Sequence, residues 1–340
     1  MEFTTIPSLS QKVSRLGLGT WPMGGSLWGD SDEQESIRTI HHAFHLGINF
    51  IDTAPGYGFG QAEEIIGKAI KQYGHRENVI IASKFGLNLD RQNDVYRDSR
   101  PASILKEVET SLKRLQVDYI DLYQVHWPDP HTPQEETAKV LRKLLDQGKI
   151  RTIGISNYSL QEIEEFTKYA PIHAIQHPFN IFEREAESTI LSYCLKHKLT
   201  SVGYSSLCRG LLTGTLKEDQ KFEDLRKNFD PKFRKPHFSQ YLVCVGRLLQ
   251  WVEDKHHQSL VSLAIRWSLD KGVDIALWGA RKPEELDPIQ SILNWRLTKE
   301  DFEEIDQIIS ETVKDPIGPQ FMSPPLRRQD AQEFSDNKPL

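Results

Sequence analysis

Four side chains that can carry acid–base chemistry stand near the ends of three successive apolar segments of the chain. In order they are Asp52, Tyr57, Lys84 and His126. A tyrosine hydroxyl has a pKa near ~10, so it is protonated at neutral pH and can donate a proton. A neighbouring ammonium favours the phenolate and makes the tyrosine a stronger acid. Tyr57 beside Lys84 is therefore a candidate general acid.

The other two side chains complete a device for protonating an oxygen. Asp52 can hold Lys84 charged and in place, and His126 can hydrogen-bond a carbonyl oxygen. None of the four is a hydride source, so a cofactor must supply the hydride that attacks the carbonyl carbon. The alternative is structural, with an Asp52–Lys84 ion pair and two packed residues at strand ends. The coincidence of all four types on three consecutive segments favours the functional interpretation.

Short apolar or β-branched runs alternate with longer amphipathic stretches along most of the chain. Such runs are typical of strands buried on both faces. Eight strands are predicted, at residues 14–19, 48–54, 79–85, 119–126, 150–156, 174–179, 201–207 and 274–280. Helices are predicted at 32–46, 61–73, 101–116, 133–147, 159–170 and 183–197. This alternation predicts an α/β fold, a single-domain (β/α)8 TIM barrel whose active site lies at the C-terminal ends of the strands.

Three segments fall outside the strand–helix repeat. Residues 3–13 are expected to form an N-terminal hairpin that closes the barrel floor. Residues 210–240 are too long for an ordinary βα loop, and residues 315–340 hold five prolines, so both are expected to be long cover loops over the barrel mouth. We expect the barrel to span residues 1–328 and residues 329–340 to form a flexible tail.

The composition disfavours several classes of protein. The 340 residues carry 42 basic and 48 acidic side chains, and a net charge of −6 argues against a nucleic-acid partner. No apolar stretch is long enough to span a membrane, and the N-terminus lacks the pattern of a signal peptide. The three cysteines have no CxxC spacing, which fits the cytoplasm. His41 and His45 lie one helical turn apart without an accompanying metal motif, so no metal site is predicted.

Six strings of residues, in this order, resemble the aldo/keto reductase family. They are LGLGTW, DTAPGYGFG, SLKRLQVDYIDLYQVHWPDP, GKIRTIGISNY, SLCRGLLTG and WGARKPEEL. The resemblance runs from about residue 15 to residue 325 and is closest to the bacterial general-stress members. It implies an oxidoreductase in which Tyr57 is the general acid, Lys84 lowers the pKa of Tyr57, Asp52 orients Lys84 and His126 positions the substrate carbonyl.

The resemblance also implies the contacts of a nicotinamide cofactor. Ser156, Asn157 and Gln176 would grip the carboxamide, and Tyr204 would stack on the ring. Residues 205–212 would follow the pyrophosphate, and Arg281 would lie near the 2′-phosphate. The full implied cofactor set is Thr20, Trp21, Asp52, Ser156, Asn157, Gln176, Tyr204, Ser205, Ser206, Leu207, Cys208, Arg209, Gly210, Leu211, Arg226, Gly279, Ala280, Arg281 and Glu285. The implied substrate pocket is lined by Trp21, Trp28 and Trp127.

Two positions depart from the family pattern near the cofactor phosphates. Thr215 stands where many relatives have a lysine, and Glu285 stands where glutamine or arginine is common. A carboxylate beside a phosphate dianion is unfavourable unless Arg226, Arg281 or a neighbouring lysine offsets it. We expect NADPH to be preferred, with NADH as a possible cofactor.

Two other functions remain open at this point. Some relatives are regulatory subunits that sense a bound nicotinamide cofactor, and an intact set of four catalytic residues does not exclude that role. A metal-dependent barrel hydrolase is the third interpretation, but only His126 and Asp52 would serve it at the strand ends. The expected partner is a small carbonyl substrate, and the expected assembly is a monomer or weak oligomer.

Overall fold

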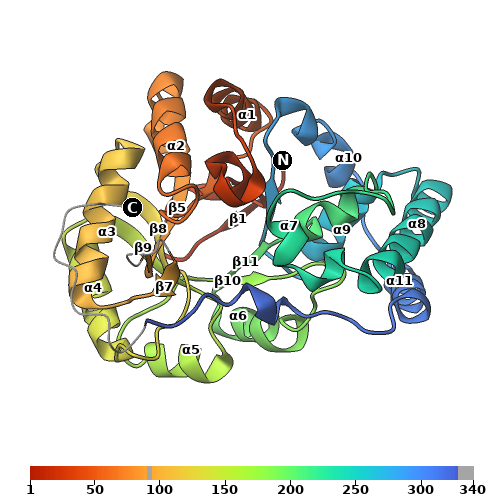
Figure 1. Ribbon diagram of the computed structural model, residues 1–340. Coiled ribbons are helices and arrows are strands. Elements are labelled where there is room, and N and C mark those ends of the chain that lie inside the picture. The colour runs from red at the N-terminus through yellow and green to blue at the C-terminus, as the bar shows by residue number, and fades with distance from the viewer. Residues whose placement is uncertain (90–93, 328–340) are drawn as a thin grey trace.

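Eight parallel strands close into a barrel, as the sequence predicted (Figure 1). The structure is a computed structural model that describes residues 1–89 and 94–327. Each barrel strand falls within or one residue beyond a predicted apolar run. The strands, in their order around the barrel, are β3 (Leu16–Gly19), β4 (Phe50–Asp52), β5 (Ile80–Phe85), β8 (Ile120–Val125), β9 (Ile150–Ser156), β10 (Ala174–Pro178), β11 (Thr200–Tyr204) and β12 (Ile275–Gly279).

Helices surround the barrel and bury the outer faces of its strands (Figure 1). They are α1 (Glu33–His45), α2 (Gln61–Tyr73), α3 (Pro101–Leu115), α4 (Gln134–Asp146), α5 (Leu160–Phe166), α6 (Ser192–His197), α7 (Leu225–Asn228), α8 (His237–His256), α9 (Leu260–Asp270), α10 (Ile289–Leu293) and α11 (Lys299–Thr312). None of the helices in the described part of the chain is long and apolar enough to cross a membrane.

Two helices are shorter than the sequence predicted. α5 ends at Phe166 rather than Ala170, because the N–H groups of Lys168 and Tyr169 bond three residues back, in turns rather than α-helix. α6 begins at Ser192 rather than Glu183, after a π-helical turn. The Asn180 side chain accepts the backbone N–H groups of Phe182 and Glu183, and this tight turn replaces the predicted first turn of helix.

The barrel floor is closed by the predicted N-terminal hairpin. Strands β1 (Phe3–Thr5) and β2 (Lys12–Ser14) pair antiparallel. Ile6 and Val13 are fully buried and pack with the apolar side chains that fill the lower barrel, among them Phe50 and Leu122. The open end for a site is therefore the C-terminal end of the strands.

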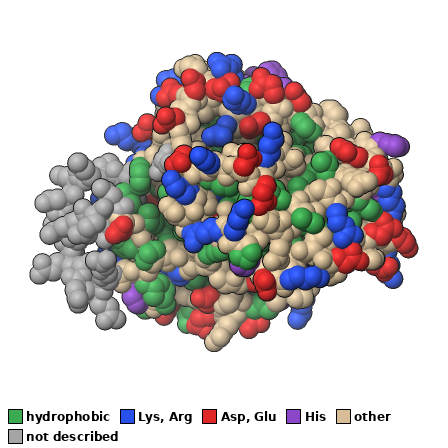
Figure 2. Space-filling view, turned by 45° about the vertical axis from the view of Figure 1, so that its right-hand side comes forward, with side chains coloured by type: hydrophobic (Ala, Val, Ile, Leu, Met, Phe, Trp, Pro, Cys, Tyr) green, Lys and Arg blue, Asp and Glu red, His purple; other side chains and the backbone are tan. Residues whose placement is uncertain are grey.

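That end is covered by the long loops that the sequence predicted. Residues 210–240 form two 3-10 turns, α7 and the start of α8. The C-terminal segment runs from α11 to a hairpin of β6 (Leu87–Leu89) and β7 (Val95–Arg97), where Leu326 pairs with Arg97 (Figure 1). The tail predicted at residues 329–340 lies outside the described residues. On the face shown in Figure 2, acidic and basic side chains are interspersed rather than gathered by sign.

Close packing of α2 on α3 makes Gly67 a test of the fold. A Cβ added at Gly67 would lie 2.4 Å from the carbonyl oxygen of Arg114, so we expect Gly67→Ala to destabilise the protein by about 1–3 kcal/mol. Gly246 in α8 faces open space, and Gly246→Ala should stabilise it by up to ~1 kcal/mol. Urea unfolding of both variants measures this, and equal effects at the two sites would contradict the packing.

Candidate active site

The structure brings the four candidate catalytic side chains together at the barrel mouth. Lys84 Nζ donates to both carboxylate oxygens of Asp52 at 2.8 Å and lies 3.2 Å from Tyr57 Oη. The rings of Tyr57 and His126 meet edge to face, with centroids 6.0 Å apart. A phenol, an ammonium, a carboxylate and an imidazole therefore form one constellation, although they are spread over 75 residues of sequence.

Strand register explains the convergence. Asp52 is the last residue of β4 and Lys84 is the fifth of the six residues of β5, and both point into a barrel whose lower part is filled by apolar side chains. Their side chains are 3% and 0% exposed, so neither charge reaches water. Lys84 also donates to the Thr53 carbonyl at 2.9 Å. An unpaired charge at this depth would be costly, and each of these groups therefore fixes the other.

Burial sets the protonation states of the constellation. It raises the pKa of Tyr57 well above the ordinary value of 10.0, and Asp52 adds to that shift. It lowers the pKa of Lys84, opposed by Asp52, and it lowers the pKa of His126 well below 6.5, with a further contribution from Lys84. The role of Lys84 in lowering the pKa of Tyr57 stays a prediction, because the shift found here comes from burial and Asp52. At neutral pH the phenol is protonated and the imidazole is neutral.

The residues implied for the carboxamide form one hydrogen-bonded row beside the constellation. Asn157 donates to the His126 carbonyl at 2.9 Å and to Ser156 Oγ at 3.0 Å. Tyr204 donates its hydroxyl to Asn157 Oδ1 at 2.8 Å, and Gln176 donates to Asp52 Oδ1 at 2.7 Å. Their amide and hydroxyl groups complement the donors and acceptors of a carboxamide, so this row fits a nicotinamide.

The implied pyrophosphate loop follows β11 and has an unusual backbone. Ser205, Cys208 and Arg209 have positive φ of 63°, 46° and 54°. Ser206 Oγ is buried and has no hydrogen-bond partner among residues 1–89 and 94–327, so it is a candidate contact for a ligand. The Arg209 guanidinium, in contrast, is buried and already paired. Burial raises the pKa of the Cys208 thiol to about 12, so Cys208 is not a reactive thiolate.

The remainder of this loop and the turn after β12 hold other residues implied for the cofactor. Gly210 lies against Arg226, and Gly279 pairs with Gly19 across the barrel seam. The other implied residues here are buried or nearly so: Leu207, Leu211, Thr20 and Ala280. Thr20 donates its hydroxyl to the Asp52 carbonyl at 2.9 Å, which connects this end to the acid–base constellation.

Two arginines stand at the implied adenosine end, each with a carboxylate beside it. Arg226 pairs with Asp224 through Nε at 2.9 Å, and its guanidinium lies 5.8 Å from the Trp28 ring. Glu285 accepts the backbone N–H of Arg281 at 2.7 Å. Sequence reasoning had named Glu285 but missed Asp224, whose role only its pairing with Arg226 reveals.

The three tryptophans implied for the substrate pocket are not equivalent. Trp21 stacks on Tyr57 with centroids 5.9 Å apart, and Trp28 meets the edge of Trp21 at 5.5 Å. Trp127 lies 5.3 Å from the guanidinium of Arg97, which also donates to the Pro324 carbonyl. Trp28 therefore connects the mouth with the adenosine end, whereas Trp127 lies at the C-terminal segment. Arg97 carried no signal in the sequence.

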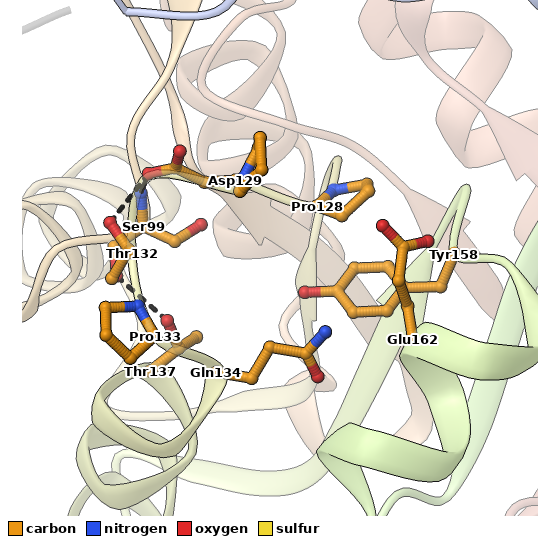
Figure 3. Close-up of a pocket in the computed structure, with 10 residues that line it drawn as sticks. Ser99, Pro128, Asp129, Thr132, Pro133, Gln134, Thr137, Tyr158 and Glu162 are labelled. Atoms are coloured by element: carbon orange, nitrogen blue, oxygen red, sulfur yellow. Dashed lines mark hydrogen bonds between the residues drawn. The ribbon is translucent and has the colours of Figure 1, made fainter. Parts of the chain in front are cut away.

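A separate cavity of about 290 Å³ lies beside the mouth, between the N-terminal ends of α4 and α5. Figure 3 shows the Tyr158 hydroxyl and the Gln134 amide directed into this space, with Asp129 hydrogen-bonded to Ser99 and Thr132. None of the four candidate catalytic side chains lines it. The cavity is therefore distinct from the acid–base constellation.

The predicted histidine pair makes no cluster. His41 Nε2 lies 2.9 Å from the Ala69 carbonyl in the groove between α1 and α2. Within residues 1–89 and 94–327, no three His, Cys, Asp or Glu side chains gather as metal ligands would.

Comparison with known proteins agrees with this geometry. The sequence model of the aldo/keto reductase family matches residues 15–310. The chain belongs to the aldo/keto reductase family. Members of this family are oxidoreductases that use nicotinamide cofactors and act on small carbonyl substrates.

Individual relatives cover nearly the whole chain. The aldo-keto reductase YhdN of Bacillus subtilis is 52% identical over 332 residues, 97% of this chain and 100% of that protein. The NADH-specific methylglyoxal reductase of Escherichia coli is 37% identical, covering 85% of this chain and 92% of its own. The solved structure of the glycerol dehydrogenase AKR11B4 from Gluconobacter oxydans is 46% identical with a TM-score of 0.85, covering 94% of this chain and 99% of that one.

The lowered pKa of His126 makes a direct prediction. An ordinary histidine takes up a proton as the pH falls through about 6.5, and buried His126 should not. Because the unfolded chain binds that proton and the folded chain does not, this group costs stability as the pH falls below ~6.5. NMR titration of the ring protons, assigned with His126→Gln, checks it. A titration of His126 centred near 6.5 would contradict the burial.

Proposed function

We propose that this protein reduces aldehydes or ketones to alcohols with NADPH as the hydride donor and Tyr57 as the general acid. The observation that carries the proposal is the distance of 3.2 Å between Lys84 Nζ and Tyr57 Oη, inside a buried group that also holds Asp52 and faces His126. A protonated phenol next to an ammonium is a proton donor whose conjugate base has a counter-charge already in place.

Each side chain has one task in this proposal. A bound nicotinamide supplies the hydride that goes to the carbonyl carbon. Neutral His126 orients the carbonyl oxygen by a hydrogen bond, and Tyr57 Oη gives that oxygen its proton. Lys84 stabilises the phenolate that remains, and Asp52 keeps Lys84 in place. Because Asp52 and Lys84 are out of contact with water, little reorganisation accompanies the change in charge.

The preference for NADPH rests on Arg226 and Arg281. Both are cations at the implied adenosine end, and their guanidinium groups would supply charge-assisted hydrogen bonds to a 2′-phosphate. Asp224 and Glu285 lie beside these arginines and reduce the net positive charge there. The advantage of a 2′-phosphate is therefore smaller, and NADH can serve as a second cofactor. The relative from Escherichia coli is named as NADH-specific, so the family includes members that use NADH.

We place the activity in the cytoplasm, on a monomer or weak oligomer. All three cysteines, Cys194, Cys208 and Cys244, are buried free thiols, as expected for a protein kept in a reducing compartment.

Removal of one oxygen atom tests the general acid. Tyr57→Phe should lower kcat for aldehyde reduction by roughly 10²–10⁴-fold, because it removes the proposed proton donor. The dissociation constant for NADPH should stay within about 2-fold of that of the unaltered protein, because the phenol is proposed to act in proton transfer and not in cofactor binding. Steady-state kinetics and fluorescence titration give the two values.

Tyr158→Phe is the matched control, because it removes a hydroxyl in the separate cavity of Figure 3 and should leave kcat unchanged. An active Tyr57→Phe variant would refute the assignment. Tight cofactor binding with slow turnover of every aldehyde and ketone tried would favour the cofactor-sensing role instead.

The cofactor preference has its own test. Arg226→Gln should lower kcat/KM for NADPH by about tenfold or more and leave kcat/KM for NADH nearly unchanged, because a charge-assisted bond to phosphate is lost. Arg247→Gln, which removes a surface arginine paired with Glu311, is the control. A kcat/KM for NADH equal to or higher than that for NADPH in the unaltered protein would contradict the proposed preference.

A further inference from the structure

Four charged side chains form a fully buried cluster behind the implied pyrophosphate loop. Arg209 Nε donates to Asp230 Oδ2 at 2.6 Å, and its Nη2 donates to Glu183. Lys232 Nζ donates to Glu183 Oε1 at 2.7 Å. All four side chains are at most 1% exposed, and two cations balance two anions. The acid–base constellation shares none of these residues.

The cluster joins three segments that are distant in sequence. Glu183 follows β10, Arg209 follows β11, and the other two members belong to the long cover loop. The C-terminal segment closes it from outside, since the Phe321 ring lies 5.2 Å from the Arg209 guanidinium and 4.8 Å from Lys232 Nζ. A cation desolvated against an aromatic face is held electrostatically as well as by packing.

The loop tied by this cluster is strained. Three of its non-glycine residues, Ser205, Cys208 and Arg209, have a left-handed backbone that side chains disfavour. Such conformations persist only where the surroundings over-determine them. The Arg209 guanidinium supplies that constraint, because Nη1 donates to Ser205 Oγ at 2.7 Å while Nε and Nη2 are fixed by the two carboxylates.

The strained backbone leaves hydrogen-bond donors for a ligand. The N–H groups of Ser206 and Leu207 donate to no group among the described residues, and Ser206 Oγ is buried without a partner. Consecutive N–H groups in turns of mixed handedness form concavities that bind anions. The donors of Arg209, in contrast, are directed to the cluster and to Ser205, and its charge is balanced by Glu183 and Asp230.

We propose that Arg209 is a positioning residue that never touches the phosphates. The cluster of Glu183, Arg209, Asp230 and Lys232 holds residues 205–210 in the conformation that presents their backbone donors to the cofactor pyrophosphate. The inference rests on the proposed use of a nicotinamide dinucleotide, and it replaces direct binding by the Arg209 side chain with an indirect role. Disturbing the cluster should therefore weaken cofactor binding without altering the chemical step.

Asp230→Asn separates the two roles of Arg209. The substitution keeps the shape of the side chain and removes one of the two charges that balance the guanidinium. If Arg209 positions the loop, the dissociation constant for NADP⁺ should rise about tenfold, because fewer molecules hold the competent loop, while kcat at saturating NADPH stays within about 2-fold. If Arg209 is a phosphate ligand restrained by Asp230, binding should tighten instead, and that result overturns the proposal.

Amide hydrogen exchange of the protein without cofactor gives an independent measurement. Residues 205–211 should exchange faster in Asp230→Asn than in the unaltered protein. Weaker binding without faster exchange, or no change in either, would also overturn the proposal. If the unaltered protein binds no nicotinamide dinucleotide, the proposed function fails, yet exchange still reports whether the cluster holds the loop.

Two further variants make the result interpretable. Asp121→Asn removes an equally buried carboxylate, paired with Arg76 at 2.7 Å at the start of β8, and should lower stability without affecting cofactor binding or exchange of the loop. Lys232→Met removes the second cation of the cluster, which donates to Glu183, and should act in the same direction as Asp230→Asn. It serves as the test variant if Asp230→Asn does not fold.

Discussion

The buried ion pair of Lys84 and Asp52 is the constraint on which the site depends. Two charges removed from water are tolerated only when each meets its counter-charge and its remaining donors and acceptors are used. Lys84 therefore binds both oxygens of Asp52 and the Thr53 carbonyl, and Gln176 donates to the same carboxylate. The same ammonium also lies 3.2 Å from Tyr57 Oη and so holds the phenol at the mouth of the barrel. The acid of the proposed reaction is thus placed by the need to satisfy a buried charge.

The same physical rule acts a second time, farther from the chemistry. The cluster around Arg209 is as dry as the Lys84–Asp52 pair, but it fixes a backbone rather than a reacting group. The charges at the adenosine end are different, because Arg226 and Arg281 remain partly exposed. Pairs that reach solvent contribute little rigidity. The mouth therefore combines two buried charge groups with one partly exposed end at Arg226 and Arg281.

Related proteins share the fold but differ in their named substrates. Relatives covering nearly the full chain include one named as a glycerol dehydrogenase and one named as a methylglyoxal reductase. Their names describe different substrates, although the first shares the barrel fold with a TM-score of 0.85. The cover loop at residues 210–240 and the C-terminal segment, fixed by Arg97 and Phe321, shape the space above the constellation. In barrels of this kind the loops at the C-terminal ends of the strands generally carry the differences in function.

The sequence by itself determined the barrel, its hairpin floor and the place of its open end, because apolar runs buried on both faces are local signals that need no knowledge of distant contacts. It also identified Asp52, Tyr57, Lys84 and His126, since each stands at or just after the end of such a run. The tertiary structure alone decided that the pKa of Tyr57 is raised, because that shift depends on burial. It also decided the late start of α6, which follows the Asn180 turn. It alone revealed that Arg209 faces away from solvent toward Glu183 and Asp230. Burial and the partners that Arg209 meets in Glu183 and Asp230 arise only on folding and leave no periodicity to read, whereas the Asn180 turn is local but overlaps a stretch with a helical pattern.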